Sequence, residues 1–214
     1  MDSVTGVGVL DKAVALLRVL AQGPLSLNGL QAATGLPRAT AHRLAVALEV
    51  HGLLRRDAEG RFDLGPELAT LGRAASERFP LASLALPVLS ELRDETGESV
   101  QLFVREGNQR RCVVSLQSPH ALRWIVPEGV LFPLDVGSAG RVLQGEPTTQ
   151  GWIASVEERE AGVASVSAPV HDSGGDIVAA VSVSGPIDRL TRRPGQKFGA
   201  EVVAAATKIA QAVG

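Results

Sequence analysis

A helix-turn-helix pattern over residues 27–48 constrains this 214-residue chain more than any other feature. Thr34 and Gly35 mark a tight turn between two helical stretches, because glycine tolerates the positive φ that such a turn requires. Pro37 suits the first position of the second helix, where a missing N–H costs nothing. The pattern predicts a small helical unit whose second helix reads DNA.

The second helix divides into two faces when successive residues are stepped by about 100°. Its apolar core face consists of Ala41, Leu44, Ala45 and Leu48. The opposite face, which we expect in the major groove, consists of Ala39, His42, Arg43 and Val46. Arg38 and Thr40 lie at the helix N-terminus, where side chains and N–H groups meet phosphates. Arg43 suits either a guanine edge or a phosphate, and the sequence does not choose between them.

The segments around this pattern strengthen the prediction. Residues 9–22 predict a preceding helix, whose apolar stripe consists of Leu10, Val14, Leu17 and Ala21. Residues 53–56 and 61–64 predict two short strands around a turn. This hairpin is a wing whose Arg55, Arg56 and Arg61 are expected to reach the DNA backbone or minor groove. The alternative is a helical domain that never touches DNA.

The distribution of charged residues supports the prediction of DNA binding only in one part of the N-terminal region. Residues 1–64 hold seven basic and six acidic side chains, but five of the seven basic ones lie between Arg38 and Arg61. The positive field is therefore confined to the predicted reading surface. So modest a field suits a homodimer, which doubles the phosphate contacts.

Length and hydrophobic content, 45%, allow two domains. We expect a winged helix-turn-helix domain at 1–64, a helical linker at 65–80, and an α+β domain at 81–214 with a largely antiparallel sheet. Helices are expected at 66–79, 81–96 and 194–213, and strands at 98–104, 111–117, 163–170 and 177–184.

Several classes of protein are excluded by what the sequence lacks. Met1 is not followed by a signal-peptide pattern, and no apolar run approaches the ~20 residues of a membrane span, so we expect a cytoplasmic protein without membrane contact. The lone cysteine, Cys112, excludes an intrachain disulfide. The four histidines show no metal-ligand spacing, and we expect neither a metal nor a cofactor.

Four segments resemble the IclR family of bacterial transcriptional regulators: VLDKA at 9–13, LPRATAHRL at 36–44, GSAGR at 137–141 and AVSVSGP at 180–186. GVASVSAPV at 162–170 and GPIDRLTR at 185–192 are similar to the NdgR/AreB-like subgroup, which is associated with leucine and other amino-acid metabolism genes. The resemblance implies a winged helix joined to a GAF-like effector-binding domain. It also implies a homodimer, or a dimer of dimers, on a near-palindromic double-stranded DNA operator.

The same resemblance implies a pocket for a small-molecule effector, an organic acid or an amino acid. Its expected lining consists of Trp124, Ser138, Ala139, Ser165, Ser182 and Ser184. Alternation along a strand points Ser182 and Ser184 to one face, so that two hydroxyls project together. Gly137 and Gly140 are expected to permit close approach of a ligand. The alternative is a sheet whose serines meet only solvent or backbone.

Two departures from the family pattern concern this pocket. Ser155 stands where the family often has an acidic residue at the pocket rim. Only residues 142–150 separate the Gly-rich segment from Gly151, where the family has a longer helical insertion.

Two rival functions remain open from the sequence. The run His171, Asp172 and Ser173 holds the residue types of a small-molecule hydrolase, but adjacent residues rarely form a triad and no G-x-S-x-G elbow is present, so we expect no enzyme. Arg110 and Arg111 beside Cys112 raise the possibility of a thiol redox switch. We favour a buried Cys112, because its strand-like run continues with Val113 and Val114.

Overall fold

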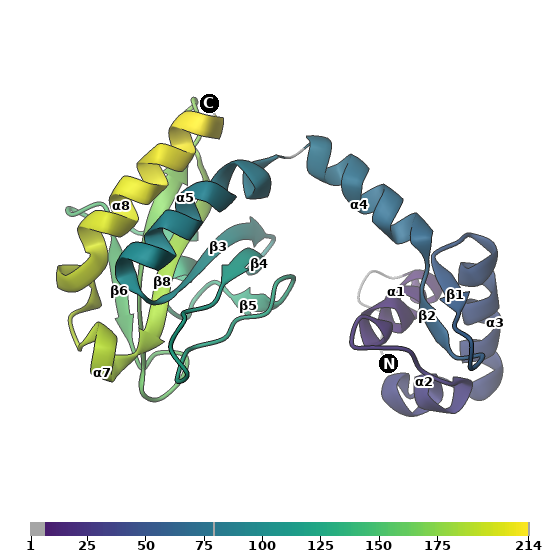
Figure 1. Cartoon of the computed structure of the whole chain (residues 1–214). Helices are drawn as coiled ribbons and strands as arrows, with labels where there is room; N and C mark the ends of the chain where they lie inside the picture. The colour runs from purple at the N-terminus through teal and green to yellow at the C-terminus, as the bar shows by residue number, and fades with distance from the viewer. Residues whose placement is uncertain (1–6, 79, 214) are drawn as a thin grey trace. The chain divides into compact units, whose positions relative to one another are not determined.

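The computed structural model describes residues 7–78 and 80–213, which fold into two compact units divided between Arg78 and Phe79 (Figure 1). Phe79, the last residue of the helix predicted at 66–79, lies outside the described residues. None of the described helices combines the length and hydropathy needed to cross a membrane.

The first unit is a three-helix core with a two-stranded wing. Its elements are α1 (Gly8–Leu20), α2 (Leu27–Thr34), α3 (Arg38–Val50), β1 (Leu54–Arg56), β2 (Phe62–Leu64) and α4 (Pro66–Arg78). The Ser26 hydroxyl caps α2 by accepting the Gly29 N–H at 3.2 Å, and Gly35 ends that helix with a φ of 69°. Leu54 and Phe62 close the core against the helices.

The stripe predicted for the first helix is only partly correct, because Leu17 packs against the core but Leu10 and Ala21 do not. Leu10 is 53% exposed and Ala21 is exposed, whereas Leu16 and Leu20 are almost fully buried. The helix is amphipathic, with Asp11 and Arg18 on one side and the buried Leu16 and Leu20 on the other. The buried face packs against α2 and α3 and lies about 100° around the helix from the predicted stripe.

The second unit is an α/β sandwich around an antiparallel six-stranded sheet of order β5-β4-β3-β8-β7-β6. The strands are β3 (Ser99–Glu106), β4 (Gln109–Leu116), β5 (Leu131–Pro133), β6 (Ile153–Val156), β7 (Val163–His171) and β8 (Ile177–Pro186). The helices are α5 (Leu81–Thr96), α6 (Ser138–Leu143), α7 (Ile187–Leu190) and α8 (Pro194–Val213). The central pair, β3 with β8, joins segments far apart in the sequence, with Gln101 opposite Ser182.

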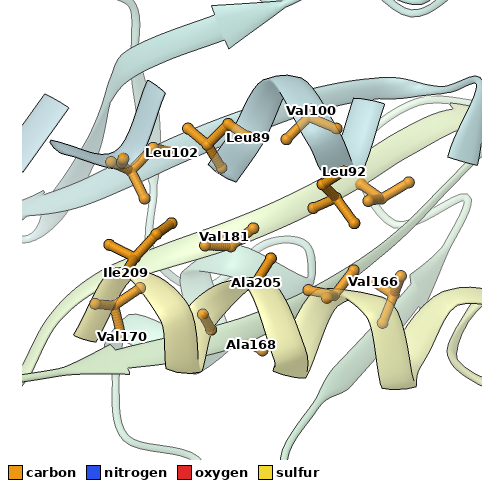
Figure 2. Close-up of a cluster of buried hydrophobic side chains, with 14 of the residues drawn as sticks. Leu89, Leu92, Val100, Leu102, Val166, Ala168, Val170, Val181, Ala205 and Ile209 are labelled. Carbon is orange, nitrogen blue, oxygen red and sulfur yellow. The ribbon is translucent and has the colours of Figure 1, made fainter. Parts of the chain in front are cut away.

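The two faces of this sheet differ in chemistry. One face carries aliphatic side chains such as Val100, Val166 and Val181, and packs against α5 and α8 (Figure 2). The other face carries Gln101 and Ser182 on the two central strands and packs against the short α6. Side-chain alternation along the strands produces the division: Val100, Val166 and Val181 each lie between residues that are polar or small and that point to the opposite face.

Two contacts fix the edges of the second unit. Arg189 of α7 donates to both oxygens of the buried Glu98 carboxylate, at 2.5 and 2.8 Å, and so holds α7 to the start of β3. The Trp152 indole lies against Gly195 and Gly199 of α8, where a Cβ on Gly199 would stand 2.6 Å from the indole Cδ1. Glycine is therefore required for α8 to lie this close to the segment that leads into β6.

Candidate functional site

The predicted reading face of α3 is open to solvent. Ala39, His42 and Arg43 are exposed and Val46 is partly exposed, whereas Ala41, Ala45 and Leu48 are buried in the core of the first unit. Arg38 and Thr40 stand in the first turn of the helix, and Arg38 donates to the Asn28 side chain of α2. The predicted division of α3 into a core face and an outer face is confirmed, and its contact with DNA stays a prediction.

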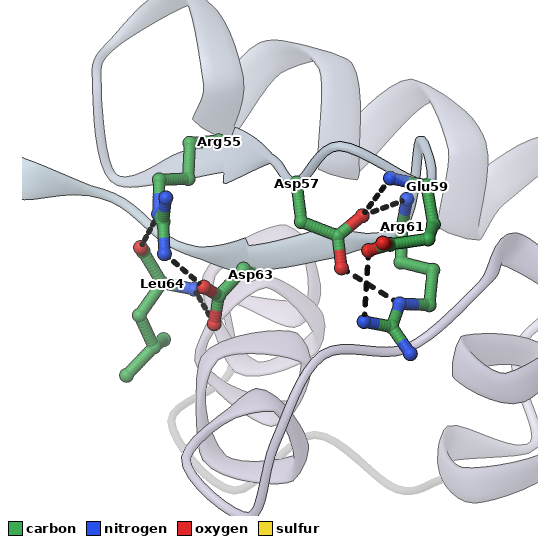
Figure 3. Close-up of polar contacts among 6 residues, drawn as sticks. All are labelled: Arg55, Asp57, Glu59, Arg61, Asp63 and Leu64. Atoms are coloured by element: carbon green, nitrogen blue, oxygen red, sulfur yellow. Dashed lines mark hydrogen bonds and ion pairs between the residues drawn. The ribbon is translucent and has the colours of Figure 1, made fainter.

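The wing arginines are exposed, but each is held by nearby carboxylates (Figure 3). Arg55 pairs with Asp63 at 2.5 Å, and Arg61 pairs with Asp57 at 2.7 Å and with Glu59 at 3.2 Å. Outside the figure, Arg56 reaches Glu49 of α3 and its guanidinium lies 4.1 Å from the centre of the Phe62 ring. The wing therefore offers DNA a set of neutralised pairs and not three free cations.

Asp57 is the centre of the wing turn. Its carboxylate accepts the backbone N–H groups of Glu59 and Arg61 at 3.1 and 2.8 Å, besides the Arg61 side chain. Burial acts to raise the pKa of Asp57, but the hydrogen bonds from Arg61 outweigh it and hold that pKa below its ordinary value. Exposed pairs of this kind contribute little stability, so phosphates can replace them at small cost.

In the second unit, the structure brings all six residues of the predicted pocket to one cavity of about 30 Å³. They are Trp124, Ser138, Ala139, Ser165, Ser182 and Ser184. Ser155, where the family pattern often has an acid, also lines the cavity. The cavity lies on the polar face of the sheet, between the strands and α6. No ligand role follows from this position alone.

Most of the predicted hydroxyls already have partners. Ser138 bonds to the hydroxyls of Ser165 and Ser167 at 2.7 and 2.8 Å, and Ser184 donates to the Gln101 side-chain oxygen at 2.7 Å. These bonds tie α6 to β7 and β8 to β3. The serines therefore hold the cavity wall together as well as lining it.

The sequence reasoning missed three polar side chains that also line the cavity, Gln101, Arg110 and Arg159. Gln101 is 1% exposed and its Nε2 has no hydrogen-bond partner; Arg110 is 2% exposed and its Nε has none. One signal for Arg110 was available. It stands two positions before Cys112 on a strand, and so shares the face on which the cysteine was predicted to be buried.

Gly140 of the GSAGR segment leaves room for Arg110, because a Cβ there would stand 2.5 Å from Arg110 Nη1 and would overlap the Leu134 carbonyl. Gly137 has a φ of 80° and lines the cavity. Close approach of a ligand to these glycines stays a prediction. The Gly137 N–H donates to the Glu158 carboxylate at 3.0 Å, so the protein's own acid already occupies the start of α6.

The two rival sites lack the required geometry. Cys112 is fully buried, as predicted, and burial raises the pKa of its thiol to about 12, which opposes thiolate chemistry. His171, Asp172 and Ser173 lead into a hairpin turn, where Asp172 accepts the N–H groups of Gly174 and Asp176, each at 2.9 Å. Across the described residues, no three His, Cys, Asp or Glu side chains gather as metal ligands would.

Two family descriptions match the chain. "IclR helix-turn-helix domain" matches residues 9–58, and "Bacterial transcriptional regulator IclR C-terminal" matches residues 73–145 and 146–211. The second match breaks within the segment 142–150, where the family's helical insertion is short in this sequence.

Curated relatives and solved structures agree with these matches. The glycerol operon regulatory protein of Streptomyces coelicolor is 31% identical over 240 residues, covering 95% of this chain and 94% of the relative. The transcriptional repressor IclR of Escherichia coli is 26% identical, covering 96% and 89%. An IclR homologue from Microbacterium hydrocarbonoxydans, crystallised with 4-hydroxybenzoate, has the same fold at a TM-score of 0.80 and 20% identity, covering 96% and 98%.

Proposed function

Because the chain belongs to the IclR family of bacterial transcriptional regulators, which are DNA-binding proteins and not enzymes, we propose that α3 and the wing bind its operator and that a small molecule modulates this binding. The observation that carries the proposal is the open outer face of α3, with Arg43 exposed opposite the buried Ala41 and Leu48. The N-terminus of α3 adds favourable phosphate contacts near Arg38 and Thr40.

The wing adds a second point of contact in this proposal. Arg55, Arg56 and Arg61 lie on the hairpin after α3 and exchange their carboxylate partners for phosphates when DNA approaches. Each exchange releases counterions from the DNA, so operator affinity is expected to fall steeply as salt rises.

The modulating ligand is proposed to bind in the cavity that Trp124, Ser138, Ala139, Ser165, Ser182 and Ser184 line. The relative crystallised with 4-hydroxybenzoate supports a small-molecule ligand for this fold. For the present chain, an organic acid or an amino acid is the proposed class of effector.

We propose that the chain acts as a homodimer, or a dimer of dimers, on a near-palindromic operator. The local positive charge of a single winged helix is modest, and pairing doubles its phosphate contacts. Light scattering of the full chain with and without operator DNA measures the assembly. A monomer that binds operator at full affinity would contradict the dimer.

Two sets of target genes are open to a direct test. The resemblance of residues 162–170 and 185–192 to the NdgR/AreB-like subgroup favours leucine and other amino-acid metabolism genes, whereas the Streptomyces coelicolor relative carries the name of a glycerol operon. Genome-wide footprinting of the protein on its own DNA separates them by the genes beside its sites. A gel shift on the best site, with candidate acids and amino acids, then tests modulation; absence of any specific site would overturn the proposal.

A further inference from the structure

Arg43 differs from the other arginines of α3 and the wing in its lack of a protein partner. Arg38 donates to the Asn28 side chain, and each of the three wing arginines is paired with a carboxylate. Arg43 is exposed, and within residues 7–78 and 80–213 its side chain makes no hydrogen bond, ion pair or ring contact. All of its N–H donors are therefore available to acceptors outside the protein.

The position of Arg43 around the axis of α3 also differs from that of Arg38. The core-facing residues of this helix are Ala41, Leu44, Ala45 and Leu48. At about 100° per residue, Arg43 lies about 30° from the direction opposite this core face, whereas Arg38 lies about 110° from it. When the outer face of α3 enters the major groove, Arg43 therefore points to the base edges and Arg38 to the phosphates beside them.

Val46 lies next to Arg43 on the same outer face. It is partly exposed, and as the third residue after Arg43 its Cβ lies about 5–6 Å from the Arg43 Cβ. An aliphatic side chain against a polar base edge leaves that edge without hydrogen bonds, which costs free energy. The major groove displays one apolar group, the 5-methyl group of thymine. Thymine is therefore the base with which Val46 makes a favourable contact.

Val50 provides an internal comparison on the same helix. It is 79% exposed and also lies on the outer side of α3. Val50 is, however, the last residue of the helix, about 6 Å beyond Val46 along the axis. Because helix-turn-helix proteins contact base edges with the N-terminal part of the second helix, we expect Val50 to lie beyond the bases that α3 reads.

We propose that α3 reads a guanine through Arg43 and the 5-methyl group of a nearby thymine through Val46. The inference rests on the proposed DNA-binding function and specifies the bases that this function recognises. Guanine suits Arg43 because its O6 and N7 accept two guanidinium hydrogen bonds at once. The two bases lie about one or two base pairs apart, because a Cβ separation of about 5–6 Å compares with a rise of about 3.4 Å per base pair.

The test begins with selection of randomised DNA duplexes by the full chain, which provides the probe. In the selected site each guanine is replaced in turn by 7-deazaguanine, which lacks N7, and each thymine in turn by uracil, which lacks the 5-methyl group. Fluorescence anisotropy gives the affinities. We expect one guanine whose replacement weakens binding at least about fivefold. We expect a thymine within one or two base pairs whose replacement weakens binding about fourfold.

Variants assign each base to its side chain. Val46→Ala should bind the thymine and uracil duplexes equally and should keep the response to 7-deazaguanine. Arg43→Ala should show the reverse pattern, measured at low salt so that its weaker binding stays within range. Each variant thus loses the response to one base and keeps the response to the other, which a general loss of affinity would not produce.

Two control variants separate base reading from folding and from phosphate contact. Val50→Ala makes the same change as Val46→Ala, with the same gain in helix propensity, and should keep both responses of the parent. Arg38→Ala should weaken binding to all the duplexes by the same factor and reduce the dependence on salt, because a phosphate contact carries no base information.

The outcomes distinguish this inference from the function on which it rests. A selected site without such a guanine and thymine overturns the assignment of bases and leaves the DNA-binding function intact. The same holds if Val46→Ala still prefers thymine to uracil as the parent does, or if Arg43→Ala still responds to 7-deazaguanine. If Val50→Ala loses the thymine response, the contact assigned to Val46 is wrong. Selection of no site overturns the proposed function itself.

Discussion

Arg110 and Arg111 are adjacent on β4, yet they have opposite electrostatic surroundings. Arg111 donates to both oxygens of Glu106, at 2.5 and 2.8 Å, and to the Gly129 carbonyl at 2.8 Å. Arg110 points to the other face of the sheet and has one carbonyl partner and no ion pair among the described residues. A single step along the strand thus separates an exposed ion pair from a buried guanidinium that has no ion-pair partner among the described residues.

Replacing Arg43 with alanine should weaken operator binding by about 1–3 kcal/mol, because its exposed side chain lies on the predicted reading face. Fluorescence anisotropy at several salt concentrations gives both the affinity and the number of phosphate contacts. Arg105→Ala, an exposed arginine in the second unit, is the control and should bind like the parent. Equal affinity of Arg43→Ala and the parent at matched salt would contradict the reading-face assignment.

Replacing Asp57 with asparagine should tighten DNA binding severalfold at low salt. The amide oxygen can still accept the backbone N–H groups of Glu59 and Arg61, so the turn survives while Arg61 loses the nearer of its two charged partners and keeps Glu59. Because the pKa of Asp57 is held below its ordinary 3.8, the pair is intact at neutral pH, and its stabilising contribution is lost as the pH falls through that lowered value. A salt titration of both proteins on operator DNA makes the comparison, and unchanged binding means that Arg61 does not reach the DNA.

Replacing glycine with alanine should have opposite effects on stability in the two helices α8 and α4. Gly199→Ala in α8 forces a Cβ against Trp152 and should destabilise the second unit by about 1–3 kcal/mol. Gly72→Ala in α4 meets nothing within 4 Å and should stabilise the first unit by about 0.5–1 kcal/mol through helix propensity. Thermal unfolding followed by circular dichroism measures both effects. A Gly199→Ala variant more stable than the parent would contradict the requirement for glycine where α8 lies against Trp152.

Cys112 should react slowly with an alkylating reagent in the native protein and rapidly after denaturation, because it is fully buried. Burial raises its thiol pKa from 9.0 to about 12, so the folded state binds the proton more tightly than the unfolded state. The resulting stabilisation is complete below pH 9.0 and is lost as the pH rises toward about 12. The free energies of unfolding of the parent and of Cys112→Ala, measured with denaturant across this pH range, should therefore converge at high pH. Rapid alkylation of the native protein would instead favour the redox alternative.

The sequence predicts the first unit well because its signals are local. Gly35 and Pro37 mark a turn and a helix start, and the two halves of the wing flank a short turn, so no distant contact is needed. The stripe predicted for α1 was displaced by about 100° from the buried face, although Asp11 and Arg18 mark the outer side of this helix. Apolar residues such as Leu10 flank the buried face, and the prediction counted them as part of the core.

The second unit was predictable in part. The strands at 98–104, 111–117, 163–170 and 177–184 correspond to β3, β4, β7 and β8, and each alternates or is rich in β-branched residues. The short β5 and β6 were missed, since three or four residues carry too little periodicity to recognise. The family resemblance predicted the serines that line the cavity. Whether Arg110 has an ion-pair partner depends on which carboxylates lie near it in the folded protein, and the sequence does not show this.

The pairing of β3 with β8 also shapes how the chain is made. The hydrogen bond between Ser184 and Gln101 joins residues 83 positions apart, so the central ladder of the sheet cannot form until synthesis has passed Ser184. The contacts of the first unit are local by comparison, and that unit can fold while the rest of the chain is still emerging. Between the folding of the first unit and the pairing of β3 with β8, the nascent protein therefore has a folded DNA-binding unit while its six-stranded sheet is still incomplete.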